Sequence, residues 1–402
     1  MIEITDSISK IMCKDSQNGY SVLGYIDTNL EFTEATIEDF LNVIIQKFPI
    51  MKQYIVEKDS NSDVFLEYDT EFNMKNHYKI IYDTYEKFDT YTDKILNLAF
   101  ETKSRWFLHY IIDKDSKKYR ICFKIDHSYA DGYKIIEMLM CPLKLTDTSK
   151  IFKPRTTNML NTLYYMIFGT VVLFINFFKI LLESLLLPHT PSEPRKTDHV
   201  RCKPFKLSDI KGISYENKIT VNDFLYALLI KTDYLYTNTK RDIVICSPIN
   251  ISGSKHLNNI APVINKIRNT MENKELLDNI HTVFDSYKYS LYIPIFSFIL
   301  QYILPLIPFA LQTHAYNSII QRCDYIYSNV IGPSHENIED IHFLTLAKDK
   351  EIVFNIISCD DNINIICSFK EGVIGDTARF EECIYAAYES LSSLSKAATQ
   401  DL

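Results

Sequence analysis

Hydrophobic and polar residues follow two different periods in the first part of the chain. Apolar residues three and four positions apart predict a helix from Glu34 to Lys47. Short apolar runs on either side predict strands from Tyr20 to Ile26 and, after the break at Phe48-Pro49, from Met51 to Val56. Alternating helices and strands indicate a mixed α/β fold.

Two further apolar runs, 106–112 and 119–125, are separated by the polar segment 113–117, which is typical of an antiparallel hairpin. Along the second run, apolar and polar positions alternate strictly. The polar set is Arg120, Cys122, Lys124 and Asp126. Because successive strand residues point to opposite faces, the pattern predicts one packed face and one wetter face, with Asp126 toward solvent.

The second half of the chain carries the same kinds of signal. Thr220-Val221-Asn222-Asp223 is typical of a helix start with a capping box, which gives Asn222 and Asp223 a capping role ahead of a substrate role. Apolar runs predict strands over 243–249 and 325–330, a hairpin of 352–358 and 363–369 around Asp360-Asp361-Asn362, and a final helix from Thr377. No internal repeat of fixed period is visible.

Two long apolar stretches interrupt these patterns. The stretch 160–187 carries only Lys179 and Glu183 as charges and approaches the roughly 20 residues needed to span a bilayer. The stretch 291–311 contains three prolines and is better interpreted as a bent interfacial or groove-lining helix. Both stretches are equally compatible with buried core helices.

A Pro-rich, charged segment without periodicity, 188–204, is the best candidate for a linker. We therefore expect an N-terminal lobe over 1–187, which includes the apolar segment 160–187, and a C-terminal lobe over 205–402.

Composition narrows the functional class. A chain of 402 residues with 47% apolar residues can form one large or two ordinary domains, and the net charge of −8 without a basic run argues against nucleic acid as a partner. Nine scattered cysteines without a C-x-x-C pair fit neither a disulfide framework nor a zinc site and predict a reducing compartment. The first thirty residues lack the apolar core of a signal peptide.

The segment Asp126-His127-Ser128-Tyr129-Ala130-Asp131-Gly132 follows a predicted strand and precedes helical apolar spacing at 135–139. His127 on such a strand-to-helix loop can project into a cleft, and histidine suits proton removal near neutral pH. Asp131 can cap the following helix, and Gly132 permits a tight or positive-φ turn. The same three residues could therefore be purely structural.

The wider sequence resembles the wax ester synthase/diacylglycerol acyltransferase family, which is built around an H-H-x-x-x-D-G motif. Segments that match in order are Phe48-Pro49-Ile50-Met51-Lys52-Gln53, Phe72-Asn73-Met74-Lys75-Asn76-His77, Ser104-Arg105-Trp106, the 126–132 motif, Thr220-Val221-Asn222-Asp223, Ser247-Pro248-Ile249-Asn250 and Ser328-Asn329-Val330-Ile331-Gly332-Pro333. The resemblance covers nearly the whole chain. The chain departs from the family pattern where Asp126 replaces the first histidine, where Arg105-Trp106 replaces a Pro-Leu-Trp step, and where Ile331 replaces a proline.

The resemblance implies two α/β lobes with a tunnel between them, and His127 as the general base that lets a hydroxyl attack the thioester of acyl-CoA. It further implies an oxyanion donor, for which the loop with Ser328 and Asn329 is the candidate, with Asn222 as a possible substrate contact. No cofactor or metal is implied; acyl-CoA, a long-chain alcohol or diacylglycerol, and a membrane surface are the expected partners. The location implied is an intracellular lipid-synthesis membrane such as the endoplasmic reticulum, and the oligomeric state is open. If Asp126 points inward instead, its charge favours protonation of the imidazole.

Other chemistries lack their starting residues, since no G-x-S-x-G, P-loop, G-x-G-x-x-G or H-E-x-x-H motif occurs. His109, His281 and His314 show no ligand-like spacing, so surface or packing roles are expected for them. Two alternatives to the lipid acyltransferase remain. One is a superfamily relative with a smaller acceptor, and the other is a non-catalytic membrane-associated protein that retains the fold, which the presence of Asp126 favours.

Overall fold

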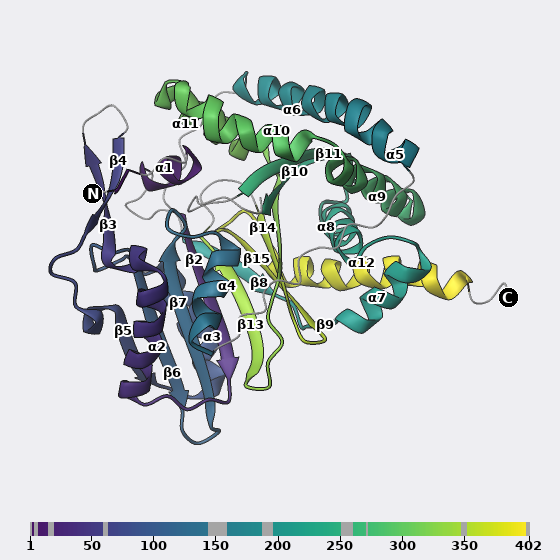
Figure 1. The fold of residues 1–402 in the computed structure, drawn as a ribbon. Helices are drawn as coiled ribbons and strands as arrows, with labels where there is room; N and C mark the ends of the chain where they lie inside the picture. The colour runs from purple at the N-terminus through teal and green to yellow at the C-terminus, as the bar shows by residue number, and fades with distance from the viewer. Residues whose placement is uncertain are drawn as a thin grey trace.

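The computed structural model describes residues 2–3, 7–14, 20–58, 63–143, 159–186, 196–250, 260–270, 272–346 and 352–398. These residues form a mixed α/β fold with two sheet-rich lobes, as the sequence predicts (Figure 1).

A five-stranded sheet in the order β13-β2-β7-β6-β5 forms the N-terminal lobe. Its strands are β2 (Ser21–Thr28), β5 (Tyr78–Tyr82), β6 (Trp106–Asp113), β7 (Lys118–Asp126) and β13 (Ile338–Thr345). The predicted hairpin of β6 and β7 is confirmed, and β5 adds to it in parallel. The lobe's sheet therefore takes its β13 edge from the C-terminal half of the chain.

Both faces of this sheet are covered. Helices α2 (Glu34–Lys47) and α4 (Gly132–Met140) pack with the odd-numbered residues of β7 in one core. Helix α3 (Phe88–Asn97) packs on the other face, where Cys122 joins a second core. The prediction of a wet face on β7 is wrong for this reason, since every residue from Tyr119 to Asp126 is buried.

The remaining N-terminal elements are short. Helix α1 (Ser7–Lys14) and a three-stranded sheet of β1 (Ile2–Glu3), β4 (Asp63–Tyr68) and β3 (Gln53–Lys58) flank the lobe. Strand β3 begins two residues later than predicted because Pro49–Lys52 forms a 3-10 turn after α2. Further 3-10 turns occur at Met74–His77, Tyr85–Lys87 and Cys141–Leu143.

A second sheet in the order β11-β10-β12-β14-β15-β8, with β9 beside β15, forms the C-terminal lobe. Its strands are β8 (Thr197–Arg201), β9 (Phe205–Lys206), β10 (Asp242–Asn250), β11 (Ile260–Arg268), β12 (Tyr325–Ile331), β14 (Ile352–Cys359) and β15 (Asn362–Lys370). The predicted hairpin of β14 and β15 is confirmed, with Asp360 in the left-handed region at its turn.

One face of this sheet packs against α7 (Leu207–Glu216), α8 (Val221–Thr237), α9 (Asn273–Tyr289) and α12 (Thr377–Ala398). At the β10–β11 end, the sheet packs against α6 (Thr170–Leu185), α10 (Tyr292–Phe298) and the end of α11 (Phe309–Arg322). Figure 1 shows α6 and α11 side by side along one edge of the molecule.

The chain segments do not divide between the lobes as the sequence suggests. Strand β13 lies inside the range expected for the C-terminal lobe, yet it pairs with β2 over Ile338 to Thr345. Of the expected linker 188–204, residues 188–195 lie outside the described residues, and Thr197–Arg201 forms β8 against β15. Each lobe therefore borrows an edge strand from beyond its expected boundary, which satisfies backbone groups that would otherwise be unpaired.

The two apolar stretches form helices with exposed apolar surfaces. The first is α5 (Met159–Tyr164), a π turn (Tyr165–Gly169) and α6, and its part Thr162–Leu185 is long and apolar enough to cross a membrane, with only 22% of its most apolar window buried. The second continues from α10 through a π turn (Ile299–Ile303) and a 3-10 turn (Leu304–Leu306). It follows α9 at a bend of 54°. Neither stretch is a buried core helix in the described part of the chain.

Candidate functional site

His127 lies in a tight turn that connects β7 to α4. The amide of Tyr129 donates to the carbonyl of Asp126 at 3.0 Å, and the amide of His127 donates to the carbonyl of Tyr20 at 2.6 Å. Asp126, Ser128 and the three residues that follow are buried, whereas His127 is partly exposed. The turn therefore holds the backbone of His127 firmly and leaves its side chain accessible.

Asp131 and Gly132 take the structural roles that the sequence allows, with one difference. Asp131 is the N-cap of α4 and accepts the amide of Lys134 at 2.9 Å, as predicted. Gly132 is the first residue of the helix and does not have a positive φ, so of the tight or positive-φ turn that glycine permits, the positive-φ form is not adopted. A Cβ at Gly132 would lie 3.5 Å from Cγ2 of Val330. The motif therefore packs directly against β12 of the other lobe.

Asp126 does not face solvent, contrary to the sequence prediction. Its side chain is fully buried. One carboxylate oxygen accepts the amide of Ser128 at 2.9 Å and its hydroxyl at 2.7 Å, and the other lies 3.2 Å from Nη1 of Arg105. The prediction failed because it assumed that one face of β7 was open, and that face is covered.

The Ser328–Asn329 segment is part of β12 and not a loop, which corrects a second expectation. Asn329 donates its amide to Oδ1 of Asn222 at 2.9 Å, and the hydroxyl of Tyr327 donates to the same oxygen at 3.1 Å. Burial raises the pKa of Tyr327 well above its usual value, so the phenol remains a donor. Asn222 and Asn329 are therefore held together.

Ser328 lies on the opposite face of β12 from Asn329, because strand residues alternate. It shares that face with Val330, which joins the core of the N-terminal lobe and contacts the Gly132 position. The three candidates from the second lobe therefore fall into two groups. Ser328 faces toward the His127 motif, and Asn329 with Asn222 faces α8.

The capping prediction for α8 holds for Asp223 but not for Asn222. Thr220 and Asp223 form a capping box, in which the amide of Thr220 donates to Oδ2 of Asp223 at 2.8 Å. The side chain of Asn222 is directed to β12 instead. The same Oδ2 of Asp223 lies 2.7 Å from Nδ1 of His281, a pairing that no sequence spacing indicated because 58 residues separate the two.

Gly332 is a further residue whose role only the structure shows. A Cβ there would lie 2.0 Å from the carbonyl oxygen of Ser358, so any side chain would displace β14. Its neighbour Ile331, which takes the place of the family's proline, is half exposed. Position 332 therefore accommodates only glycine, because two parallel strands approach each other closely there.

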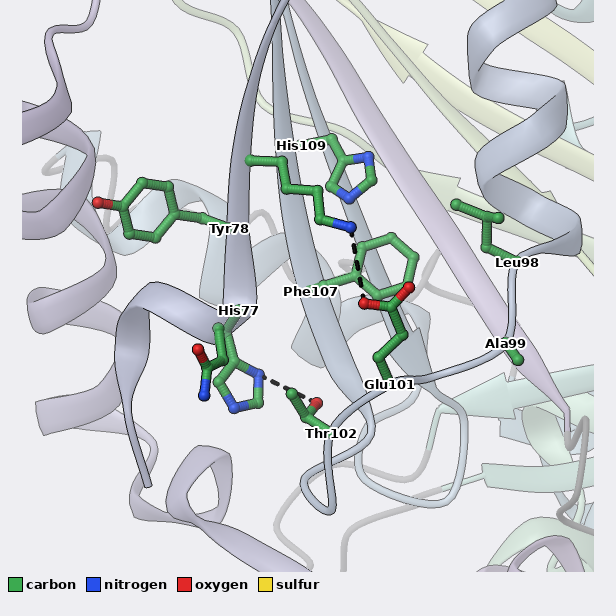
Figure 2. A pocket seen from close by; sticks show the side chains of 10 residues that line it. His77, Tyr78, Leu98, Ala99, Glu101, Thr102, Phe107 and His109 are labelled. Atoms are coloured by element: carbon green, nitrogen blue, oxygen red, sulfur yellow. Dashed lines mark hydrogen bonds and ion pairs between the residues drawn. The ribbon is translucent and has the colours of Figure 1, made fainter. Parts of the chain in front are cut away.

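A pocket lies at the outer edge of the N-terminal sheet, lined by residues of β5, β6 and the segment between α3 and β6 (Figure 2). Lys79 pairs with Glu101 at 3.6 Å, and Thr102 lies 3.4 Å from Nδ1 of His77. Burial lowers the pKa of His109 to about 4, so this imidazole is neutral at physiological pH. His127 is not among the residues that line this pocket.

The described residues contain no group of three or more His, Cys, Asp or Glu side chains that could hold a metal ion. None of the nine cysteines forms a disulfide, seven of them are buried, and burial raises the thiol pKa of several, including Cys122.

The sequence was compared with protein-family models and with curated protein sequences. Residues 258–392 match the family model described as the WS/DGAT C-terminal domain. A comparison with curated protein sequences finds no match.

Solved structures match over nearly the full chain. A wax ester synthase/diacylglycerol acyltransferase from Marinobacter aquaeolei is 13% identical, with 97% of this chain and 98% of that chain covered and a TM-score of 0.62. A trichothecene 15-O-acetyltransferase from Fusarium sporotrichioides is 13% identical over 98% and 94% of the two chains, with a TM-score of 0.65. The first condensation domain of the CDA synthetase is 8% identical over 98% and 96%, with a TM-score of 0.63.

At these identities the structural matches establish the two-lobed fold, whereas the family model bears on residues 258–392 of the C-terminal lobe. The family resemblance that the motifs predict is thereby confirmed over residues 258–392, which match the wax ester synthase/diacylglycerol acyltransferase C-terminal domain, and the fold that it implies is confirmed over nearly the whole chain.

Proposed function

We propose that this acyltransferase moves a fatty acyl group from acyl-CoA to the hydroxyl of a long-chain alcohol or diacylglycerol, with His127 as the general base. The observation that carries the proposal is the His127 turn. Its backbone is fixed, its neighbours are buried, His127 itself is partly exposed, and Gly132 of the same motif packs against Val330 on β12 of the second lobe. A general base needs this combination of fixed position and access.

The reaction follows from these groups. His127 removes the proton from the acceptor hydroxyl, and the alkoxide oxygen attacks the thioester carbonyl. The tetrahedral oxyanion collapses, the carbon–sulfur bond breaks, and the departing CoA thiolate takes up the proton from His127. Neither an acyl-enzyme nor a metal is required.

Ser328 is the preferred donor to the oxyanion. It shares the face of β12 that contacts the motif, whereas the amide of Asn329 is already bonded to Asn222. We assign Asn222 and Asn329 to the support of β12 rather than to the reacting atoms. Ser328→Ala should then lower kcat about 10²- to 10³-fold, the usual effect of losing one oxyanion donor.

We also propose that the outer face of α5, α6 and α10–α11, here called the apolar face, binds a membrane surface. Its members are more than a third exposed: Leu163, Tyr164, Met166, Ile167, Phe168, Val171, Val172, Ile175, Phe178, Leu182, Leu185, Leu186, Leu291, Ile295, Phe298, Tyr302, Ile303, Leu306, Ile307 and Leu311. Soluble surfaces rarely expose a contiguous apolar patch of this kind, and a lipid acceptor would have to be taken from a bilayer.

The central experiment incubates purified, detergent-solubilised protein with labelled palmitoyl-CoA and a panel of long-chain alcohols, diacylglycerol, sterols and short alcohols. His127→Ala should lower ester formation about 10²- to 10⁴-fold. His314→Ala, on the exposed side of α11, is the matched control and should retain activity. Unchanged turnover in His127→Ala would overturn the mechanism, esterification of short alcohols alone would favour a smaller acceptor, and no ester from any acceptor would favour a non-catalytic protein.

Membrane binding is tested by flotation with phosphatidylcholine/phosphatidylserine vesicles. The triple variant Phe168→Ser/Ile175→Ser/Leu182→Ser should lose most vesicle binding and keep its unfolding temperature, because these side chains are more than half exposed. Tyr215→Ser on α7 removes an 83% exposed aromatic side chain away from the apolar face and should change nothing. Equal flotation of the triple variant and the parent would contradict the proposal.

A further inference from the structure

Two of the positions at which this chain departs from its family contact each other. Arg105 lies where the family has its Pro-Leu-Trp step, and Asp126 replaces the first histidine of the motif. Nη1 of Arg105 lies 3.2 Å from Oδ2 of Asp126, and the amide of Asp126 donates to the carbonyl of Arg105 at 2.9 Å. The two substitutions therefore form one local unit at the end of β7.

The carboxylate of Asp126 shapes the turn that carries His127. Its Oδ1 accepts both the amide and the hydroxyl of Ser128, so the residues on each side of His127 are tied together. The amide of Tyr129 closes the same turn onto the carbonyl of Asp126. Aspartate at the first position of such a turn bonds the backbone two residues on, which fixes the dihedral angles of the residue between.

The second carboxylate oxygen explains why Arg105 is needed. Asp126 is fully buried, and an unpaired buried carboxylate is strongly unfavourable. Arg105 supplies the opposite charge from a side chain that is 22% exposed, so its guanidinium reaches the carboxylate from the rim of the lobe. The ion pair of Arg105 and Asp126, here called the clamp, is neutral overall and lies directly before the candidate base.

We propose that Arg105 and Asp126 are a positioning pair that orients His127 and replaces, in this chain, the family's first histidine. The inference deepens the proposed acyl transfer and rests on it. A histidine at 126 could not reproduce the clamp, because an imidazole lacks two acceptor oxygens and its protonated form would be repelled by Arg105. Restoring the family residue should therefore impair this protein.

The kinetic test compares Asp126→Ala, Asp126→Asn, Asp126→His and Arg105→Lys in the full chain. Asp126→Ala should lower kcat about 10- to 100-fold, with KM for both substrates within about twofold, because misplacing a catalytic group affects the chemical step more than binding. Asp126→Asn keeps an acceptor for Ser128 and should lose less, Asp126→His should lose as much as alanine, and Arg105→Lys should retain most activity. A kcat of Asp126→Ala within twofold of the parent would overturn the proposal.

A second measurement is independent of turnover. In protein labelled with [¹³Cε1]histidine, the His127 resonance is assigned by its loss in His127→Gln. We expect one sharp line in the parent and in Asp126→Asn, and a broadened or split line in Asp126→Ala. An unchanged line in Asp126→Ala would refute the positioning role, even if the parent esterifies nothing. A broadened line in Asp126→Ala together with an inactive parent would mean that the positioning role is correct and that the proposed substrates are wrong.

Discussion

Two regions reverse the usual distribution of polar and apolar side chains: the face of β7 with Arg120, Lys124 and Asp126, and the apolar face. On β7, Arg120, Lys124 and Asp126 are all at least 96% buried. On the apolar face, Phe168 in the π turn before α6 and Ile175 and Leu182 on α6 are more than half exposed. One region hides charges within a lobe, and the other presents apolar side chains to the outside.

The difference shows what each region needs from its surroundings. Each β7 charge has a partner in the fold: Arg120 forms a bidentate pair with Asp27 at 2.6 and 2.8 Å, and Lys124 donates to the carbonyls of Leu96 and Leu98. Buried charges are tolerated only when they are paired in this way. The apolar face has no comparable cover among the described residues, which is why we assign it an external one.

The largest effect should come from breaking the buried pair at Arg120. Arg120→Met leaves Asp27 buried without its guanidinium and should cost about 3–5 kcal/mol in the free energy of unfolding. Urea denaturation measures the loss. The double variant Arg120→Met/Asp27→Leu is the control and should recover most of it; a double variant as unstable as the single one would show that the pair does not act as a unit.

The next largest loss of stability is expected on the buried side of α6. Leu173 is 5% exposed and packs against β11 and α10, so Leu173→Ala should cost about 2–5 kcal/mol by creating a cavity. Thermal and urea unfolding provide the measurement. A negligible loss would mean that α6 is not packed on the sheet in solution.

Lys124 should produce a smaller, pH-dependent effect. Burial lowers its pKa to about 7, compared with 10.5 for an ordinary lysine. Between these values the unfolded chain binds a proton that the folded chain does not, so this residue makes stability rise with pH, by up to about 1.4 kcal/mol per pH unit. Urea midpoints of the parent and of Lys124→Met across pH 7 to 10 should therefore diverge, and parallel curves would contradict the assignment.

The smallest effect is expected on the exposed side of the same helix. Val172 is 53% exposed and adjacent to Leu173, so Val172→Ser should change the free energy of unfolding by no more than about 0.5 kcal/mol. Its matched partner is the Leu173→Ala variant. A loss as large as that of Leu173→Ala would place Val172 in a covered interface and remove the contrast between the two sides of α6.

Local signals in the sequence determined much of the fold. The helix from Glu34 to Lys47 was predicted to its last residue, and the β6–β7 and β14–β15 hairpins were predicted within a few residues. The capping box before α8 and the Asp131 cap were also predicted correctly. These features depend on spacing and on contacts within a few residues, which a single sequence displays directly.

Contacts between distant segments decided the rest. The buried Asp126 is paired with Arg105, 21 positions earlier. The turn of Asn222 toward Asn329 depends on a pairing over 107 residues, and β13 joins a sheet formed from residues more than 200 positions earlier. Alternation along β7 predicted two faces correctly but could not say that both would be covered.

The sequence by itself thus determined that His127 follows a strand, precedes a capped helix and belongs to a recognisable motif. Only the tertiary structure decided that its neighbour is a buried, paired carboxylate and that the motif's glycine packs against β12. The physical reason is that periodicity records which side chains share a face of one element, whereas burial and ion pairing depend on which other element covers that face.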